Sequence, residues 1–421
     1  MSRKNTIFVQ IASYRDPELP NTLESLFSNA SKPENLNVCI AWQHGEDEDL
    51  SIFNEKYKEN LLILDIPYQE SKGACWARNQ IQQNYNGEKY TLQLDSHHRF
   101  IKGWDTKLIK MLKNLQKKKH KKPLLTSYAP SYNPQKDPEG RSEEPWWMQF
   151  DRFIPEGAIF FLPASIPNHK NLKEPIPARF YSAHFAFTVG EFAQEVQHDP
   201  NMYFHGEEIS IAVRAFTHGY DLFHPHEVIV WHEYTRKGRV KQWDDDKTWI
   251  SKNNESHKRN RILFGMEPGC TPCMQNQLKP YGFGSERSLE DYERYAGIRF
   301  KDRAVQQYTV DNNFPPNPII EDKEEYEKSF TRIFKHCIDL NLSDFLEKDY
   351  EFWVVAFHDK EHNTIYRQDA DKQEIKRILQ DPAGYGKLWR TFNTSTEPAY
   401  WVVWPFSTSK GWCDKITGTL W

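Results

Sequence analysis

The first hundred residues alternate between two hydrophobic periods, which predicts strands separated by helices. Four short apolar runs have the length and pattern of strands, at residues 6–12, 37–42, 61–66 and 90–94. After the first run, Leu19, Leu23 and Leu26 repeat along one face of a helix. Another helix is expected from Gly73 onward. This β-α-β-α-β-α-β order predicts an α/β fold in which helices flank a mainly parallel sheet.

Between residues 100 and 310 the same alternation continues. A lysine-rich helix is expected over 103–119, and strands over 124–128, 156–162, 180–189, 219–223 and 228–232. The long loop at 130–145 is rich in proline and ends in Trp146 and Trp147. Long loops in compact domains are often binding loops. The two tryptophans therefore either stack on a sugar or anchor the loop in the core.

The pattern breaks at residues 311–325, where prolines interrupt a polar run. We expect a linker there, between a first domain at 1–310 and an accessory domain at 326–421. In the accessory domain a helix is expected at 326–338, followed by short strands at 352–358, 364–367, 388–392 and 400–405. This is a small α+β domain with acceptor binding as its candidate role. Its tryptophans, Trp389 and Trp412 among them, either form a carbohydrate platform or fill the core.

Composition and charge exclude several classes of protein. Of 421 residues, 38% are hydrophobic and 14% aromatic, which supports a packed core and argues against disorder. The formal net charge of −4 leaves no basic footprint for nucleic acid. No apolar run approaches the roughly 18 residues that span a bilayer. No apolar signal segment precedes the first strand, so we expect a cytoplasmic protein without a membrane span.

The six cysteines are scattered along the chain, which argues against a disulfide framework. Only Cys270 and Cys273 have the spacing of a pair of metal ligands. A zinc site needs two more ligands, and His257 is a candidate for one of them. Two interpretations stay open: a structural zinc, or two reduced thiols in a turn.

The central strand ends in a group of candidate metal ligands. Asp95, Ser96 and His97 directly follow the apolar run at 90–94. In an extended backbone, Asp95 and His97 point to the same side, and a carboxylate with an imidazole suits an ion such as manganese. His232 ends another predicted strand and is a natural third ligand. An ordinary polar turn is the alternative for an isolated Asp-x-His pair.

Further candidates lie at the same predicted edge of the sheet. No GxGxxG motif follows the first strand, so a dinucleotide-binding fold is not supported. Instead, Arg15 and Arg78 could each hold a diphosphate through a guanidinium group, or lie at the surface. Gly206, Glu207 and Glu208 lie at a predicted helix start, where the backbone favours anionic groups.

The order of these motifs resembles the GT-A glycosyltransferases. The matching stretches are Ser13–Asp16, Gly73–Asn79, Leu94–His97, Gly206–Glu208, Trp231–His232, Leu289–Glu293 and Ala296–Ile298. The chain looks most like the family of the cytoplasmic N-acetylglucosaminyltransferase that modifies hydroxyproline on Skp1. It is also similar to the polypeptide N-acetylgalactosaminyltransferases. The resemblance covers roughly residues 5–310 and does not reach the accessory domain.

The resemblance implies roles for individual residues. Asp95, His97 and His232 would coordinate Mn²⁺ or Mg²⁺, which bridges the diphosphate of a UDP-sugar. The implied catalytic residues are Asp95, Glu207 and Glu208. The substrate-binding candidates are Ser13, Tyr14, Arg15, Arg78, Ser96, Trp146, Trp147, His205, Gly206, Tyr234 and Arg236. The N-acetylgalactosaminyltransferases have a tryptophan where this chain has His205, so the sugar pocket is expected to differ.

Taken together, the motifs predict a retaining, divalent-metal-dependent glycosyltransferase. It would move GlcNAc, or a related HexNAc, from a UDP-sugar to a hydroxyl of a protein or glycan. Two alternatives from other classes stay open. One is a metallohydrolase that cleaves phosphate esters with the same Asp and His cluster. The other is a non-catalytic adaptor that binds glycans.

Overall fold

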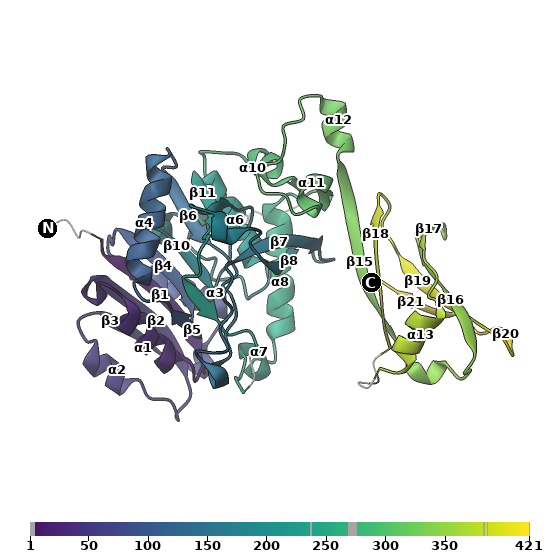
Figure 1. Cartoon of the computed structure of the whole chain (residues 1–421), viewed down its shortest axis with the longest axis horizontal. Coiled ribbons are helices and arrows are strands. Elements are labelled where there is room, and N and C mark those ends of the chain that lie inside the picture. Colours follow the sequence, from purple (N-terminus) through teal and green to yellow (C-terminus); the bar gives the residue numbers. More distant parts are fainter. Residues whose placement is uncertain (1–4, 236–237, 268–275, 382–383, 385, 421) are drawn as a thin grey trace. The chain divides into compact units, whose positions relative to one another are not determined.

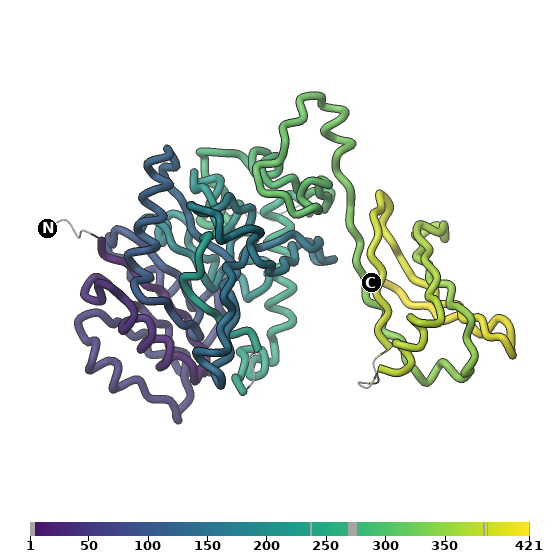
Figure 2. The backbone as a smooth tube through the Cα atoms, viewed as in Figure 1, coloured from purple at the N-terminus to yellow at the C-terminus, as the bar shows by residue number. Residues whose placement is uncertain are grey.

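A computed structural model describes residues 5–235, 238–267, 276–381, 384 and 386–420. The chain divides into two compact units (Figures 1 and 2). The first comprises Met1–Lys301 and Tyr308–Ile320, and the second Asp302–Gln307 and Glu321–Trp421. The predicted linker at 311–325 and the acceptor-binding role of 326–421 stay predictions. No helix in the described parts of the chain is long and apolar enough to cross a membrane.

The first unit is built on an eight-stranded sheet with the order β3-β2-β1-β4-β10-β6-β11-β9. Its strands are β1 (Ile7–Tyr14), β2 (Leu36–His44), β3 (Leu61–Pro67), β4 (Tyr90–Asp95), β6 (Lys122–Thr126), β9 (Ile176–Pro177), β10 (Phe185–Val189) and β11 (Tyr220–His224). The pairs β1–β2, β2–β3, β1–β4 and β6–β11 are parallel. Strand β10 runs antiparallel to β4 and β6. The prediction of a mainly parallel sheet is confirmed.

Helices cover both faces of this sheet, as predicted (Figure 1). The described helices of the first unit are α1 (Leu19–Asn29), α2 (Ser51–Lys56), α3 (Ala74–Gln82), α4 (Trp104–Lys117), α5 (Phe192–Glu195), α6 (Glu207–Thr217), α7 (Gln242–Asp245), α8 (Trp249–Leu263), α10 (Leu289–Ala296) and α11 (Gln307–Val310). Alternate residues of β1 serve the two faces, because side chains in a strand alternate. Val9 and Ile11 pack with α1 and α4, whereas Phe8 packs with α3.

Two small antiparallel sheets complete the described part of the first unit. Strand β5 (His98–Phe100) pairs with β12 (Val230–His232), and His98 lies opposite His232. Strand β7 (Trp146–Phe153) pairs with β8 (Ile159–Ser165). The predicted strand at 228–232 therefore exists, but it belongs to a separate ribbon and not to the main sheet. A two-residue strand, β13 (Ile298–Arg299), follows α10.

The second unit is α+β. Its elements are β14 (Ala304–Gln306), α12 (Lys323–Lys328), β15 (Phe330–Leu340), β16 (Tyr350–His358), β17 (Thr364–Arg367), α13 (Lys372–Leu379), β18 (Gly386–Thr394), β19 (Tyr400–Ser407), β20 (Gly411–Trp412) and β21 (Ile416–Thr419). The predicted helix at 326–338 is wrong, because α12 ends at Lys328 and β15 pairs with β18. Phe334, Ile338 and Leu340 lie at even spacing and contribute to one core, as strand residues do.

Candidate functional site

A cleft opens at the carboxyl ends of β1 and β4, the usual place for ligands in an open α/β sheet. Its described lining is Ala12, Tyr14, Asp16, Gln43, Ser71, Gly73, Ala74, Arg78, Asp95, Ser96, His97, Tyr203, Phe204, Arg239, Val240, Lys241, Gln242 and Trp243. These residues come from the carboxyl ends of strands and the loops after them, from the start of α3, from the segment before α6 and from the segment around α7. The cleft is therefore the candidate functional site.

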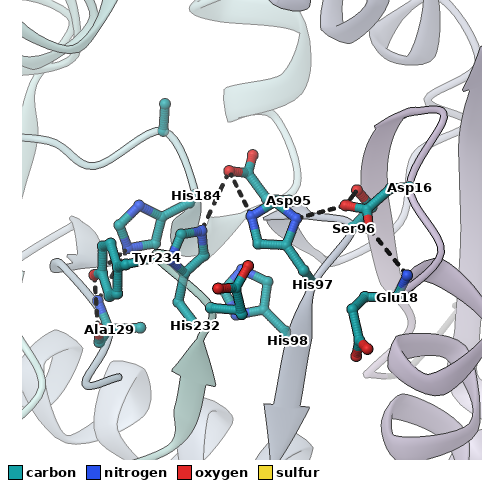
Figure 3. Close-up of polar contacts among 12 residues, drawn as sticks. Asp16, Glu18, Asp95, Ser96, His97, His98, Ala129, His184, His232 and Tyr234 are labelled. Atoms are coloured by element: carbon teal, nitrogen blue, oxygen red, sulfur yellow. Dashed lines mark hydrogen bonds and ion pairs between the residues drawn. The ribbon is translucent and has the colours of Figure 1, made fainter. Parts of the chain in front are cut away.

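The three predicted metal ligands lie together, and two of them, Asp95 and His97, line this cleft. One ligand atom each from Asp95, His97 and His232 can be chosen so that all lie within 4.8 Å of one another. The Nε2 atoms of His97 and His232 lie 3.7 Å and 3.4 Å from Oδ2 of Asp95 (Figure 3). The β5–β12 pairing brings His232 to the end of β4.

Asp16 fixes the orientation of His97. Its Oδ2 accepts hydrogen bonds from Nδ1 of His97 and Oγ of Ser96, both at 2.7 Å, and from Nη1 of Arg239 at 3.0 Å. Burial raises the pKa of Asp16, but His97, Arg239 and Ser96 outweigh this effect and lower the pKa to about 2. The contact with Asp16 points Nε2 of His97 toward Asp95, and in the neutral ring with its proton on Nδ1 that Nε2 atom offers a lone pair to a ligand.

His232 is held as a neutral base. Its backbone N–H donates to the carbonyl oxygen of Pro130 at 2.9 Å, but neither ring nitrogen has a hydrogen-bond partner among the described residues. Burial, followed by the charge of His97, holds the pKa of His232 well below its usual value. The His184 ring stacks on it with a centroid distance of 4.2 Å. A buried imidazole without a partner is suited to metal coordination.

Asp95 supplies negative charge to the cluster. Burial raises the pKa of Asp95, but His232, Arg78 and His97 outweigh this effect and hold the pKa well below the usual value. Asp95 is therefore ionised at neutral pH. One carboxylate and two imidazoles form a donor set that suits manganese and similar divalent ions.

A second group of residues joins the starts of α3 and α6. Arg78 donates to Oδ1 of Asp95 at 2.7 Å and to Oε1 of Glu207 at 2.5 Å. The thiol of Cys75 donates to Oε2 of Glu207. Arg78 is only 5% exposed, so its guanidinium mainly connects the two carboxylates. Arg78 also lines the cleft, and its predicted contact with the diphosphate stays a prediction.

Gly206 and Glu208 flank Glu207 at the start of α6. Gly206 has φ +97°, and a Cβ there would lie 2.2 Å from Nδ2 of Asn260, so only glycine fits. Glu208 accepts hydrogen bonds from Tyr128 Oη and the Ala183 N–H, at 3.0 and 2.9 Å. Burial raises the pKa of Glu208 to about 7.

The residues after β1 lie at the other side of the cleft. Tyr14 Oη and Arg15 Nη1 both donate to Oδ2 of Asp245, at 2.7 and 3.1 Å. Tyr14 and Ser96 line the cleft, whereas Ser13 is fully buried and does not. Arg15 also lies over the ring of Tyr68, at 4.5 Å from its centroid.

The remaining predicted substrate contacts divide into two groups. Trp146 lies beside Tyr234, whose hydroxyl donates to Ala129 O at 2.7 Å; neither lines the cleft. Trp147 is 3% exposed and packs against Phe314. It faces away from Trp146, because consecutive side chains in a strand point to opposite sides. This position favours the interpretation of Trp147 as an anchor of the loop in the core over stacking on a sugar.

His205 packs beside Phe160 and His257, and it does not line the cleft. Burial lowers the pKa of His205 to about 4. Arg236, Cys270 and Cys273 lie outside the described residues, so their predicted roles stay predictions.

Several residues of the site were not predicted from the sequence: Asp16, Cys75, His184, His198 and Arg239. Asp16 and Cys75 had a local signal, because Asp16 lies in the polar loop after the first strand and Cys75 lies in the Gly73–Asn79 stretch. The other residues contact side chains that are far away in the sequence. Such contacts produce no periodic hydrophobic pattern or local motif from which they could be predicted.

A family model described as glycosyltransferase (GlcNAc) matches residues 6–63 and 50–302. The chain belongs to this glycosyltransferase family. The match spans the first unit and ends before the second unit's main elements. It confirms the predicted enzyme class and, with the observed sheet, the GT-A fold class. No curated protein sequence matches the chain.

Similar solved structures are distant. GalNAc-T7 with UDP, GalNAc and Mn²⁺ is 14% identical with a TM-score of 0.45; the match covers 66% of this glycosyltransferase and 55% of GalNAc-T7. S. aureus TarS 1-349 with UDP-GlcNAc is 13% identical, with a TM-score of 0.39 and coverages of 66% and 70%. The mannosyltransferase PcManGT from Pyrobaculum calidifontis, with GDP-Man and Mn²⁺, is 12% identical, with a TM-score of 0.37 and coverages of 65% and 67%.

Proposed function

We propose that this glycosyltransferase moves GlcNAc, or a related HexNAc, from a UDP-sugar to a hydroxyl of a protein or glycan. Membership of the family described as glycosyltransferase (GlcNAc) supports the donor sugar. The observation that carries the proposal is the group of Asp95, His97 and His232 at the cleft, next to Glu207. The closer resemblance to the Skp1-modifying enzymes stays a prediction.

The proposed metal site is formed by Asp95, His97 and His232. The unpartnered ring nitrogens of His232, the ionised carboxylate of Asp95 and the oriented Nε2 of His97 fit a divalent cation. Such a cation, Mn²⁺ or Mg²⁺, would supply charge stabilisation for the departing diphosphate. Tyr14 and Ser96 would contact the nucleotide part of the donor, because both line the cleft.

The chain's own residues are proposed to orient the donor sugar. Glu207 offers a carboxylate that can accept hydrogen bonds from sugar hydroxyls, and Gly206 permits close approach of the backbone. In the proposed retaining reaction, the anomeric carbon's bond to the diphosphate breaks and its bond to the acceptor oxygen forms on the same face. The acceptor's proton passes to the departing diphosphate, so no enzyme nucleophile is required.

The second unit is proposed to contribute to acceptor binding. Trp389 and Trp412 are 49% and 47% exposed, and exposed indole rings can stack on sugars or apolar side chains. Trp412→Ala and Trp389→Ala should raise the KM for acceptor and leave donor hydrolysis unchanged. An unchanged acceptor KM in both variants would contradict this role.

A donor screen tests the main proposal. UDP release is measured for several UDP-sugars, with Mn²⁺, with Mg²⁺ and with a chelator. We expect UDP-GlcNAc or another UDP-HexNAc to be hydrolysed slowly, only with a divalent ion. Release of phosphate from simple esters without UDP-sugar turnover would favour a hydrolase. Glycan binding without either activity would favour an adaptor.

A further inference from the structure

One turn of α3 holds both oxygens of the Glu207 carboxylate. Cys75 donates to Oε2, and Arg78 donates to Oε1 at 2.5 Å. Cys75 and Arg78 are three residues apart in a helix, so they project from the same face. Glu207 is 5% exposed and Cys75 is 1% exposed, so water does not compete freely for these bonds.

From this arrangement we infer that Cys75 is a positioning residue for the transfer reaction. Its thiol fixes the rotation of the Glu207 carboxylate, and thereby the direction in which Glu207 meets the donor sugar. The inference rests on the proposed role of Glu207 in donor binding.

Cys75 is the one hydrogen-bond donor to Oε2 of Glu207 among the residues that the structure describes. His198 comes closest otherwise, with Nδ1 at 3.7 Å. However, Gln93 donates its amide N–H to the carbonyl oxygen of Ala183 at 2.7 Å, so its Oε1 faces Nε2 of His198, also at 2.7 Å. Nε2 of His198 therefore carries the proton, and burial keeps the ring neutral by lowering its pKa. Nδ1 is left without a proton to donate.

The thiol is also in the correct protonation state. Burial, followed by the charge of Glu207, raises the pKa of Cys75 well above its usual value. Cys75 is therefore a neutral donor at physiological pH, and not a reactive thiolate. If the thiol is removed, one buried carboxylate oxygen loses its partner, which favours rotation of the Glu207 side chain.

Cys75, His198 and Glu207 also have the spacing of metal ligands, within 4.8 Å of one another. The Arg78 guanidinium already supplies positive charge to Glu207, which argues against a cation there. Metal analysis of the purified protein decides between the two. A tightly bound ion that Cys75→Ala removes would overturn the positioning role.

Three variants test the inference in the full chain: Cys75→Ala, Cys75→Ser and, as a matched control, Cys39→Ala. Cys39 is equally buried but lies in β2, where it packs in an apolar cluster with Ala77 and Ile81 of α3; within the described part of the chain it forms no hydrogen bond with Glu207. We expect Cys75→Ala to lower kcat by roughly tenfold, with UDP affinity in Mn²⁺ within about twofold of wild type. Cys75→Ser keeps a donor and should recover most of kcat. Cys39→Ala should keep wild-type kcat.

A double-mutant cycle with Glu207→Gln separates this inference from the proposed function. If Cys75 acts through Glu207, Cys75→Ala should have little further effect on kcat in the Glu207→Gln background. Normal turnover in Glu207→Gln would refute the proposed role of Glu207. If Glu207→Gln lowers kcat but Cys75→Ala does not, the inference about Cys75 is refuted and the proposed role of Glu207 stands. Additive losses, or a Cys75→Ser variant as impaired as Cys75→Ala, would also overturn it.

Discussion

Replacing Asp16 with asparagine tests whether the cleft holds a cation through an oriented His97. In the structure, Oδ2 of Asp16 accepts bonds from His97, Ser96 and Arg239, while Oδ1 accepts the Glu18 N–H at 2.9 Å. Asparagine has one acceptor oxygen and one N–H₂ group. In one orientation its N–H₂ group faces His97, and in the other it faces the Glu18 N–H. Both orientations place donor against donor, and both remove the negative charge.

The expected loss in metal affinity follows from this change. Residues that orient a metal-binding histidine typically change affinity by about 10- to 100-fold. At about 1.4 kcal/mol per factor of ten, this corresponds to roughly 1.4–2.8 kcal/mol. We expect Asp16→Asn to raise the Mn²⁺ concentration for half-maximal UDP release by this factor. Saturating Mn²⁺ should restore most of the turnover, because Asp95, His97 and His232 are all still present.

The assay is a Mn²⁺ titration of UDP release, with Asp105→Asn as the matched control. Asp105 is 2% exposed, and its two oxygens accept the backbone N–H groups of Ser31 and Lys32, away from the cleft lining. Asp105→Asn should lower stability without altering the dependence on Mn²⁺. A half-maximal concentration in Asp16→Asn within twofold of wild type would refute the reasoning. So would a turnover that saturating Mn²⁺ cannot restore.

Three further predictions concern the same cleft. Asp95→Asn, His97→Ala and His232→Ala should each lower turnover by on the order of 100-fold, without additivity; wild-type Mn²⁺ dependence in His232→Ala would remove it from the ligand set. Gly206→Ala should lower the melting temperature and turnover together, because its Cβ would lie 2.2 Å from Asn260; an unchanged melting temperature would contradict this. Asp16 has a pKa of about 2 in the folded protein, below its usual 3.8. Its ionised form therefore stabilises the fold above pH ~4 by about 2 kcal/mol, and this contribution is lost as the pH falls toward 2. Unfolding of Asp16→Asn should therefore depend less on pH between about 5 and 2 than unfolding of wild type.

The sequence predicted the positions of Asp95, His97 and His232 well, because each ends an apolar run and strand ends gather at one edge of a sheet. Their role as ligands stays a prediction. The roles of Cys75 and Arg239 could not be found in this way, because Cys75 contacts Glu207 and Arg239 contacts Asp16 across more than a hundred residues of sequence.

Two elements show what a local pattern leaves open. Trp147 had two interpretations, and its packing against Phe314 favours the core anchor over sugar stacking. The segment at 326–338 begins with a helical, acidic stretch, and β15 then follows from pairing with β18, more than forty residues away. Local pattern alone does not reveal a partner strand.

The pairing of β5 with β12 makes the proposed cation site a late product of chain assembly. His98 and His232 meet across a ribbon whose strands are separated by more than a hundred residues. A nascent chain that has emerged only as far as β11 already contains Asp95 and His97 but lacks the third candidate ligand. Closing so long a loop costs entropy that must be offset by native contacts formed elsewhere. An incomplete chain would therefore bind metal weakly, and high metal affinity would arise only after β5 has paired with β12.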